Sequence, residues 1–207
     1  MRGIEGSTAR VIGLAGCALA AAPVACFLLL QPAARADPPA VHYGMAVAPG
    51  GLLGGDLARK LDTDGHVGGR FFLGLRRPGI GVEASLAGTD ATVIGEDAEV
   101  STFALAIEAR PSLSLAPGLS IYLHAGPSYD WIGATDHPLG QFSGLGFVYG
   151  AGFELSTRRR IESGWLLGIS FWAEESIQHL DLAGDAGGEL RGTVALTLLG
   201  VGFSFGR

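Results

Sequence analysis

Eight segments of the chain alternate apolar and other residues with a period of two, and this pattern constrains the fold more than any other feature. In the segment 118–131, Ile121 and Leu123 share one face, while Tyr122 and His124 share the other. Such alternation is typical of β-strands with two different faces. Glycine and β-branched residues recur in these segments, and both disfavour helix interiors. The sequence therefore predicts strands at 40–48, 66–76, 79–88, 99–115, 118–131, 144–156, 160–174 and 191–205.

The connections between these strands alternate in length, beginning with a long one. Short connections are expected at 76–78, 116–118 and 156–160, and longer ones at 49–65, 89–98, 132–143 and 175–190. Most of the strands reach the ~9–11 residues that a tilted strand needs to cross a bilayer. Outer-membrane barrels have short periplasmic turns and longer extracellular loops. The pattern therefore predicts an all-β fold, an eight-stranded antiparallel up-and-down transmembrane β-barrel, with its N- and C-termini in the periplasm.

The first 36 residues have the pattern of a secretory signal peptide. They contain a basic start with Arg2 and Arg10, an apolar stretch from Val11 to Leu30, and the cleavage sequence Ala34-Arg35-Ala36. We therefore expect a signal peptide at 1–36 and an outer-membrane β-barrel at 37–207. Because the apolar stretch is longer than the usual ~7–15 residues, an uncleaved membrane anchor is an alternative.

Both cysteines, Cys17 and Cys26, lie inside this predicted signal peptide. A chain that begins at residue 37 would thus have no disulfide, no thiolate nucleophile and no zinc–thiolate site. The sequence Leu14-Ala15-Gly16-Cys17 also resembles a lipobox, so lipidation of Cys17 is a further alternative. The apolar stretch continues after Cys17, whereas a mature lipoprotein should become polar there.

Charge is divided between the two ends of the predicted barrel. The long loops and their edges hold 14 of the 19 acids after residue 36, Asp130 and Glu174 among them. The short turns hold six of the 11 bases, Arg76 and Arg110 among them. We therefore expect an acidic loop end and a basic turn end. The resulting net charge of −8 (11 basic against 19 acidic residues) disfavours nucleic-acid binding.

The larger side chains predict which face meets lipid. Twelve aromatic residues fall on the apolar face, and only Phe72, Tyr122 and Trp172 fall on the other. The interior of an eight-stranded barrel is just wide enough to be filled by side chains, so twelve rings cannot fit inside. We therefore expect the aromatic face to point outward into lipid, because so much exposed apolar surface would aggregate in water. An aromatic girdle at the membrane interfaces is predicted at Tyr129, Trp131, Trp165, Phe203 and Phe205.

The inward face carries charges, and buried charges need partners because their desolvation is costly. The candidates are Arg70, Glu83, Glu108, His124 and Glu154. We interpret them as a lumen polar network of salt bridges and water. A gated path for protons or ions is the functional alternative.

Catalysis and metal binding have little support in the sequence. His124 and Ser128 lie on one predicted strand at a separation of about 13 Å, which is too far for a Ser–His pair. The other histidines lack metal-ligand spacing. We expect no catalytic residues, no metal and no cofactor. Binding of Ca²⁺ or Mg²⁺ by the acidic loops, bridging to lipopolysaccharide, is an alternative to simple solvation of those loops.

In its alternation, its rhythm of connections and its aromatic last strand at 199–205, the chain resembles the small OmpA- and OmpX-type outer-membrane β-barrels. The resemblance covers 37–207. One difference is that Gly206 and Arg207 follow the final aromatic residue, where such barrels usually end. The resemblance implies a place in the bacterial outer membrane, among its lipid and lipopolysaccharide, and folding by the barrel-assembly machinery.

We expect a monomer with a structural or surface-interaction role that presents acidic extracellular loops, and we do not expect an enzyme. A porin-like channel for small solutes is one alternative. An enzyme that modifies envelope lipid is another, although no outward-facing cluster of Ser, His and acid is present in the predicted strands.

Overall fold

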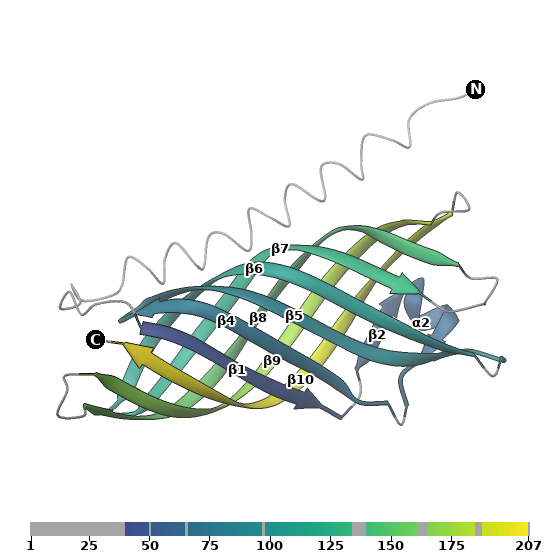
Figure 1. Ribbon diagram of the computed structural model, residues 1–207. Coiled ribbons are helices and arrows are strands. Elements are labelled where there is room, and N and C mark those ends of the chain that lie inside the picture. Colours follow the sequence, from purple (N-terminus) through teal and green to yellow (C-terminus); the bar gives the residue numbers. More distant parts are fainter. Residues whose placement is uncertain are drawn as a thin grey trace.

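A computed structural model describes residues 40–49, 51–64, 66–96, 98–133, 140–160, 165–184 and 188–206, most of them in antiparallel strands (Figure 1). The predicted signal peptide lies outside these residues. The wall of the barrel consists of β1 (Ala40–Ala48), β4 (Gly68–Arg77), β5 (Ile80–Val93), β6 (Glu99–Ala116), β7 (Leu119–Gly133), β8 (Gln141–Arg160), β9 (Leu166–Gly184) and β10 (Glu189–Gly206). Within the described ranges, no helix is long and apolar enough to cross a membrane.

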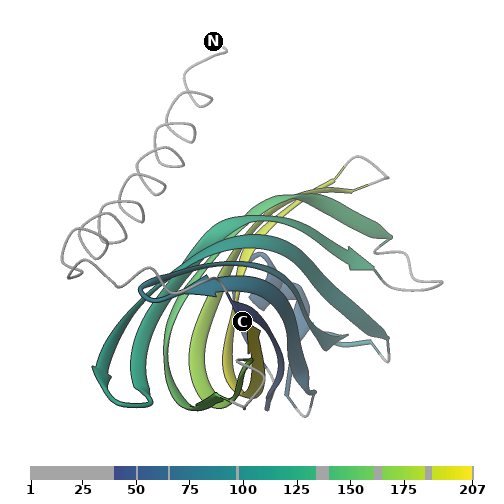
Figure 2. The same cartoon turned by 60° about the vertical axis from the view of Figure 1, so that its left-hand side comes forward.

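The sheet closes on itself because β1 pairs with both β4 and β10. Each of the eight strands pairs with its neighbours in the chain, so the topology is up-and-down. The curvature of the wall is clear in Figure 2. Following the paired residues from strand to strand once around the wall, from Ala173 of β9, ends at Ala183 of the same strand. The path passes through Leu199, Val47, Gly69, Gly88, Phe103, Trp131 and Ser143. This stagger of ten residues over eight strands corresponds to a strand tilt of about 40°.

The barrel has a turn end and a loop end. The turn end carries the short connections and the last residues of β10, and Gly79 and Gly118 adopt there the positive φ angles that tight turns require, +88° and +81°. The loop end carries the connections at 49–67, 94–98, 134–140 and 185–188. There β2 (Leu52–Gly55), α2 (Leu57–Lys60) and β3 (Leu61–Asp62) lie between β1 and β4 in the chain (Figure 1).

All eight predicted strands are present, but the loop end contains more regular structure than the sequence predicted. The predicted loop at 49–65 contains β2, α2 and β3, which are too short, at two to four residues each, to give a periodic signal. The predicted connections at 89–98, 156–160 and 175–190 are also partly wrong, because β5 continues to Val93, β8 to Arg160 and β9 to Gly184. Beyond Glu175 the apolar residues occupy the inward positions and the polar ones the outward positions, with Leu180 and Leu182 buried and Asp181 exposed. This part of the strand therefore does not match the pattern of apolar residues facing outward.

The side chains of the wall separate as predicted into an apolar outer face and a packed interior. The three aromatic residues assigned to the lumen, Phe72, Tyr122 and Trp172, are at most 3% exposed. Phe171, the neighbour of Trp172 in the sequence, is 64% exposed on the outer face. This division places the barrel core in the lumen, as expected for a narrow eight-stranded barrel.

Glycines on the inner face make room for the larger lumen side chains. A Cβ atom at Gly150 would overlap the imidazole of His124, and one at Gly152 would overlap the ring of Tyr122. Both glycines lie on β8 directly opposite those residues of β7. The glycine-rich stretch of β8 is therefore explained by close packing in the lumen.

Candidate functional site

The five residues predicted for the lumen network all point inward and are buried, each at 5% exposure or less. They come from five consecutive strands of the wall: Arg70 from β4, Glu83 from β5, Glu108 from β6, His124 from β7 and Glu154 from β8. Alternation places each of them on the inner face of its strand. The structure divides them between two connected groups of charged side chains.

The central group consists of Arg70, Ser85, Glu108, Tyr122, His124 and Glu174. Arg70 donates hydrogen bonds to Glu174 and, at 2.8 Å, to Glu108. His124 lies between the same two carboxylates, with Nδ1 bonded to Glu108 and Nε2 3.3 Å from Glu174 Oε1. The hydroxyl of Ser85 donates to Glu108, and that of Tyr122 donates to Glu174 at 2.9 Å. Each carboxylate of this group thus has several polar partners.

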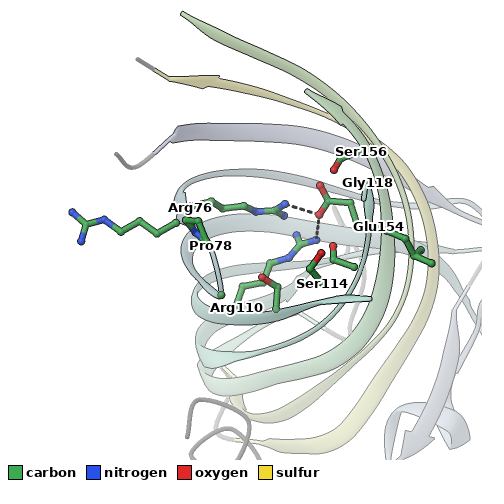
Figure 3. A pocket seen from close by; sticks show the side chains of 12 residues that line it. Arg76, Pro78, Arg110, Ser114, Gly118, Glu154 and Ser156 are labelled. Atoms are coloured by element: carbon green, nitrogen blue, oxygen red, sulfur yellow. Dashed lines mark hydrogen bonds and ion pairs between the residues drawn. The ribbon is translucent and has the colours of Figure 1, made fainter. Parts of the chain in front are cut away.

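The turn-side group consists of Arg76, Glu83, Arg110 and Glu154. Figure 3 shows Arg76 and Arg110 with Glu154. Arg110 donates to both oxygens of Glu83, at 3.1 and 3.2 Å, and to Glu154 at 3.1 Å. Arg76 donates to the same two carboxylates, at 2.9 Å to Glu83 and 2.5 Å to Glu154. Two guanidiniums and two carboxylates therefore form a closed square, in which removal of any member leaves its partners with fewer bonds.

Aromatic rings connect the two groups. The Arg110 guanidinium lies 3.4 Å from the ring centroid of Tyr122, whose hydroxyl belongs to the central group. The ring of Phe72 lies between Arg70 and Arg110, with centroid distances of 5.9 and 5.8 Å. Arginine over an aromatic face is stabilised by the ring quadrupole. The lumen charges therefore form one continuous network.

Two members of the network, Arg110 and Glu174, were assigned by the sequence analysis to turns or loop edges, and this assignment is wrong. Arg76 lies beside the short turn as predicted, with its side chain directed into the lumen. Arg110 is 2% exposed and Glu174 is 3% exposed. The necessary signal was the parity of each residue, that is, whether it occupies an inward or an outward position in the alternation of its strand. Arg110 is two residues from Glu108 on β6, so both share the inner face.

The charges of the network nearly balance. Four carboxylates (Glu83, Glu108, Glu154 and Glu174) face three guanidiniums (Arg70, Arg76 and Arg110) and two imidazoles (His42 and His124). A buried ion needs both an opposite charge and hydrogen bonds to offset its desolvation. Since each carboxylate here has both, the arrangement is suited to filling and stiffening the lumen.

The loop-end part of the lumen is apolar. We call it the loop-side cluster, and it is made of Leu57, Leu61, Val93, Val100, Ile132, Phe142, Leu180, Leu182, Leu190, Val194, Leu196 and Leu198. Most of these residues lie close to the loop ends of their strands, and Leu57 of α2 is fully buried among them. The short helix therefore places a side chain into the mouth of the barrel.

A small polar layer lies next to this cluster. Asp130 is fully buried, although the sequence analysis placed it at an acidic loop edge, and it accepts hydrogen bonds from Ser128 at 3.0 Å and Gln178 at 2.6 Å. Ser128 is thus bonded to Asp130, while His124 is bonded to Glu108. This arrangement is not that of a Ser–His pair. Within the described ranges, no group of three or more His, Cys, Asp or Glu side chains could hold a metal ion.

The five residues predicted for the aromatic girdle occur at both ends of the outer face. At the loop end, Trp131 stacks on Phe103 with 5.6 Å between the ring centroids, and its centroid lies 6.4 Å from that of Tyr129. At the turn end, Trp165 stacks on Phe205 at 4.5 Å, and Phe203 stacks on Tyr43 at 5.5 Å. Their role as membrane-interface anchors stays a prediction.

A cavity of about 400 Å³ opens at the turn end, beside the turn-side group (Figure 3). We call it the turn-side vestibule. Its lining includes the charged side chains of Arg76, Arg110 and Glu154, together with hydroxyl groups of serines near the short turns. The sequence analysis did not predict it, because its residues come from four different strands and two turns.

Comparison with known proteins supports the fold. No protein-family model and no curated protein matches the sequence. Among solved structures, Neisserial surface protein A aligns with a TM-score of 0.57 at 10% identity, over 80% of this chain and 96% of that one. Two further structures align less well. OprG from Pseudomonas aeruginosa has a TM-score of 0.35 at 15% identity, over 82% of this chain and 96% of that one. AlkL has a TM-score of 0.34 at 15% identity, over 85% of this chain and 92% of that one. The chain therefore has the fold of the small eight-stranded outer-membrane β-barrels that its sequence pattern resembles.

Proposed function

We propose that this chain is an integral protein of a bacterial outer membrane whose closed barrel serves as a structural anchor and presents an acidic surface outside the cell. The observation that carries the proposal is the filled lumen. Ion pairs close its central part and the inner wall of the turn-side vestibule, and the polar layer around Asp130 and the loop-side cluster fill the part toward the loop end. A channel would need a continuous open path, and a lipid-modifying enzyme would need an outward-facing group of reactive side chains.

The outer face supports a membrane position. Its apolar residues are widely exposed, including Met45 at 59%, Ile107 at 63% and Leu199 at 60%. Soluble monomers rarely expose contiguous apolar patches larger than a few hundred Å². Lipid around this belt, with lipopolysaccharide in the outer leaflet, would remove that surface from water. A monomer satisfies this requirement without any partner chain.

The distribution of exposed charge supports an orientation with the loop end outside. Exposed acids at the loop end include Asp62, Asp64, Glu96, Asp181 and Glu189. The short turns lie at the other end, as they do on the periplasmic side of outer-membrane barrels. Export through the signal peptide at 1–36, followed by insertion by the barrel-assembly machinery, would deliver both termini to the periplasm.

Electrical recording tests the closed barrel. Purified protein reconstituted in planar bilayers should show no stable single-channel conductance, with a general porin as the positive control for insertion and detection. Reproducible steps that scale with salt concentration would contradict the proposal and favour the porin-like alternative.

Cysteine labelling tests the orientation, since residues 37–207 contain no cysteine. Asp64→Cys, at the exposed loop end, should react with a membrane-impermeant maleimide on intact cells. Arg77→Cys, at the exposed turn end, should react only after the outer membrane is permeabilised. The parent chain controls for any signal from Cys17 or Cys26. The reverse pattern would overturn the proposed orientation.

A further inference from the structure

The turn-side vestibule has the size of a small-molecule site. Its volume of about 400 Å³ falls within the ~300–1,000 Å³ typical of ligand pockets. The turn-side group forms one wall of this space, and Figure 3 shows the side chains of Arg76 and Arg110 converging there on the carboxylate of Glu154. A ligand could therefore enter from the turn end and meet buried charge, while the network beyond would stop it from passing through.

The lining is rich in hydrogen-bond donors and poor in acceptors. Three arginines, Arg76, Arg77 and Arg110, line the space against one carboxylate, Glu154. Glu154 already accepts from both Arg76 and Arg110 through the same oxygen, Oε2. Serine hydroxyls, which can donate as well as accept, complete the polar lining at Ser112, Ser114, Ser120 and Ser156.

Three nitrogen atoms of the buried network, His42 Nδ1, His124 Nε2 and Arg76 Nη2, have no hydrogen-bond partner among the described residues. Arg76 Nη2 lies 2.9 Å from Glu83 Oε1 as an ion pair, but without the geometry of a hydrogen bond. Arg76 Nη2 itself is closed to solvent, but the Arg76 side chain as a whole is 12% exposed where it lines the vestibule, and a guanidinium group has five N–H donors and no acceptor. Arg77, the next residue of β4, lies at the rim of the vestibule with an exposed side chain on the outward face of the strand.

We propose that the turn-side vestibule binds a small ligand that carries an oxyanion, of the size of a sugar phosphate. Donor-rich surroundings favour a ligand rich in acceptors, and guanidinium groups match the geometry of phosphate and carboxylate oxygens. The serine hydroxyls suit the hydroxyls of a sugar. If the turn end faces the periplasm, the ligand comes from that compartment.

Binding can be measured on the full-length, folded barrel in detergent. Isothermal titration with glucose 6-phosphate should give saturable binding that weakens with salt, while glucose should give none. Inorganic phosphate in a third titration separates recognition of the oxyanion alone from recognition of the whole molecule. Equal binding of glucose and glucose 6-phosphate, or no binding of either, would overturn the proposal.

Two matched pairs of variants locate the site. Arg76→Gln should weaken binding of glucose 6-phosphate about three- to tenfold, because the vestibule loses one of its two inward-facing guanidiniums. Arg191→Gln removes an exposed arginine at the loop end and should leave binding unchanged. Ser156→Phe would fill the vestibule and should abolish binding, while Leu155→Phe, on the lipid-facing side, should not.

Heat-modifiable migration on gels confirms that each variant is folded before titration. If Arg76→Gln and Arg191→Gln weaken binding equally, the association is nonspecific and the proposal fails. It also fails if folded Ser156→Phe binds as the parent chain does. These outcomes are independent of the conductance and labelling experiments, so the vestibule and the proposed anchor role can fail separately.

Discussion

The two parts of the lumen are filled by opposite kinds of chemistry. The central and turn-side groups are built around arginines, glutamates and His124 held by hydrogen bonds, whereas the loop-side cluster consists of leucine, valine and other apolar residues. Both are equally shielded from solvent, since Glu83 is 1% exposed and Leu198 is 0% exposed. The difference teaches that burial alone does not determine how a position responds to substitution. An apolar side chain loses packing when it is shortened, but a charge that loses its partner stays buried and uncompensated.

The ionic part also specifies the register of the barrel. Inward and outward residues alternate, so a slip of one residue would move each strand's charges to the lipid face. A charge such as arginine at the lipid-facing midplane costs about 2–4 kcal/mol. Seven charged side chains of the network come from five strands: Arg70, Arg76, Glu83, Glu108, Arg110, Glu154 and Glu174. The loop-side cluster, which is apolar, cannot exert this penalty.

The largest expected effect comes from breaking the ionic part. Arg110→Met keeps much of the side-chain volume but leaves Glu83 and Glu154 each without one of their two arginine partners. We expect a loss of about 3–5 kcal/mol in the free energy of unfolding, as for other buried ion pairs with one partner removed. Urea titration in lipid vesicles, followed by tryptophan fluorescence, measures this loss.

Arg191→Met is the matched control, because Arg191 is exposed at the loop end. Its effect should stay within about 0.5 kcal/mol. If the two variants lose similar stability, the network contributes nothing beyond ordinary surface pairs.

The second effect concerns the apolar part. Leu198→Ala should cost about 2–5 kcal/mol, because it opens a cavity in a packed core. Leu199→Ala, its neighbour on the lipid-facing side with 60% exposure, should cost much less. Leu198→Met conserves volume and should cost less than about 1.5 kcal/mol. The same urea titration measures these losses. A larger loss in the free energy of unfolding for Leu199→Ala than for Leu198→Ala would contradict the assignment of Leu198 to the packed lumen.

Much of this comparison could be predicted from sequence, because a strand's alternation determines which side chains share a face. Period-two alternation was sufficient to place Glu83, Glu108 and His124 in the lumen and the aromatic residues outside. The same alternation also assigns Arg110 and Glu174 to inward positions, but both lie near predicted strand ends and were therefore grouped with the connections. Extending the alternation along the whole strand, up to its connection, would have placed both residues in the lumen.

The loop-side cluster and the vestibule could not be predicted in the same way. Leu57 reaches the cluster through α2, which has only four residues and no periodic signal. The turn-side vestibule depends on the stagger between strands, since residues from β4, β6, β7 and β8 meet there. Stagger follows from the pairing of all eight strands, so no single segment contains it.

The third effect compares two adjacent glutamates on β9. Glu174 faces the lumen and bonds Arg70, while Glu175 faces outward and accepts one hydrogen bond from Thr197, at 2.7 Å. Both neighbours of Glu175 across the wall, Ala151 and Thr197, carry no charge. Glu175→Leu should therefore leave stability unchanged or raise it by up to about 1 kcal/mol, since an outward carboxylate gains nothing from lipid.

Glu174→Leu is the comparison variant, and it should destabilise the barrel, because Arg70 would lose one of its two carboxylate partners. Unfolding in urea from vesicles with matched chain length measures both. A loss of stability for Glu175→Leu as large as that for Glu174→Leu would indicate that the outward carboxylate has a partner of its own.

The smallest effect concerns the attachment of α2, which carries Leu57 into the loop-side cluster. Asp56 accepts hydrogen bonds from the side chain of Arg59 and from the backbone N–H of Arg191, at 3.4 Å for the latter. The hydrogen bond from Arg59 holds the pKa of Asp56 below its ordinary value of about 3.8. A lowered pKa means that the folded state favours the ionised carboxylate, so this stabilisation is complete above the ordinary pKa and is lost as pH falls through the lowered one.

Amide protection in α2 should thus be constant from neutral pH to about pH 5 and decrease below pH 4, measured by hydrogen exchange corrected for intrinsic rates. Asp56→Asn should lower protection at neutral pH and remove this step, while amides of β9 near Leu182 should not change in either protein. A step near pH 6 instead, or one that persists in Asp56→Asn, would assign the attachment of α2 to another titrating group.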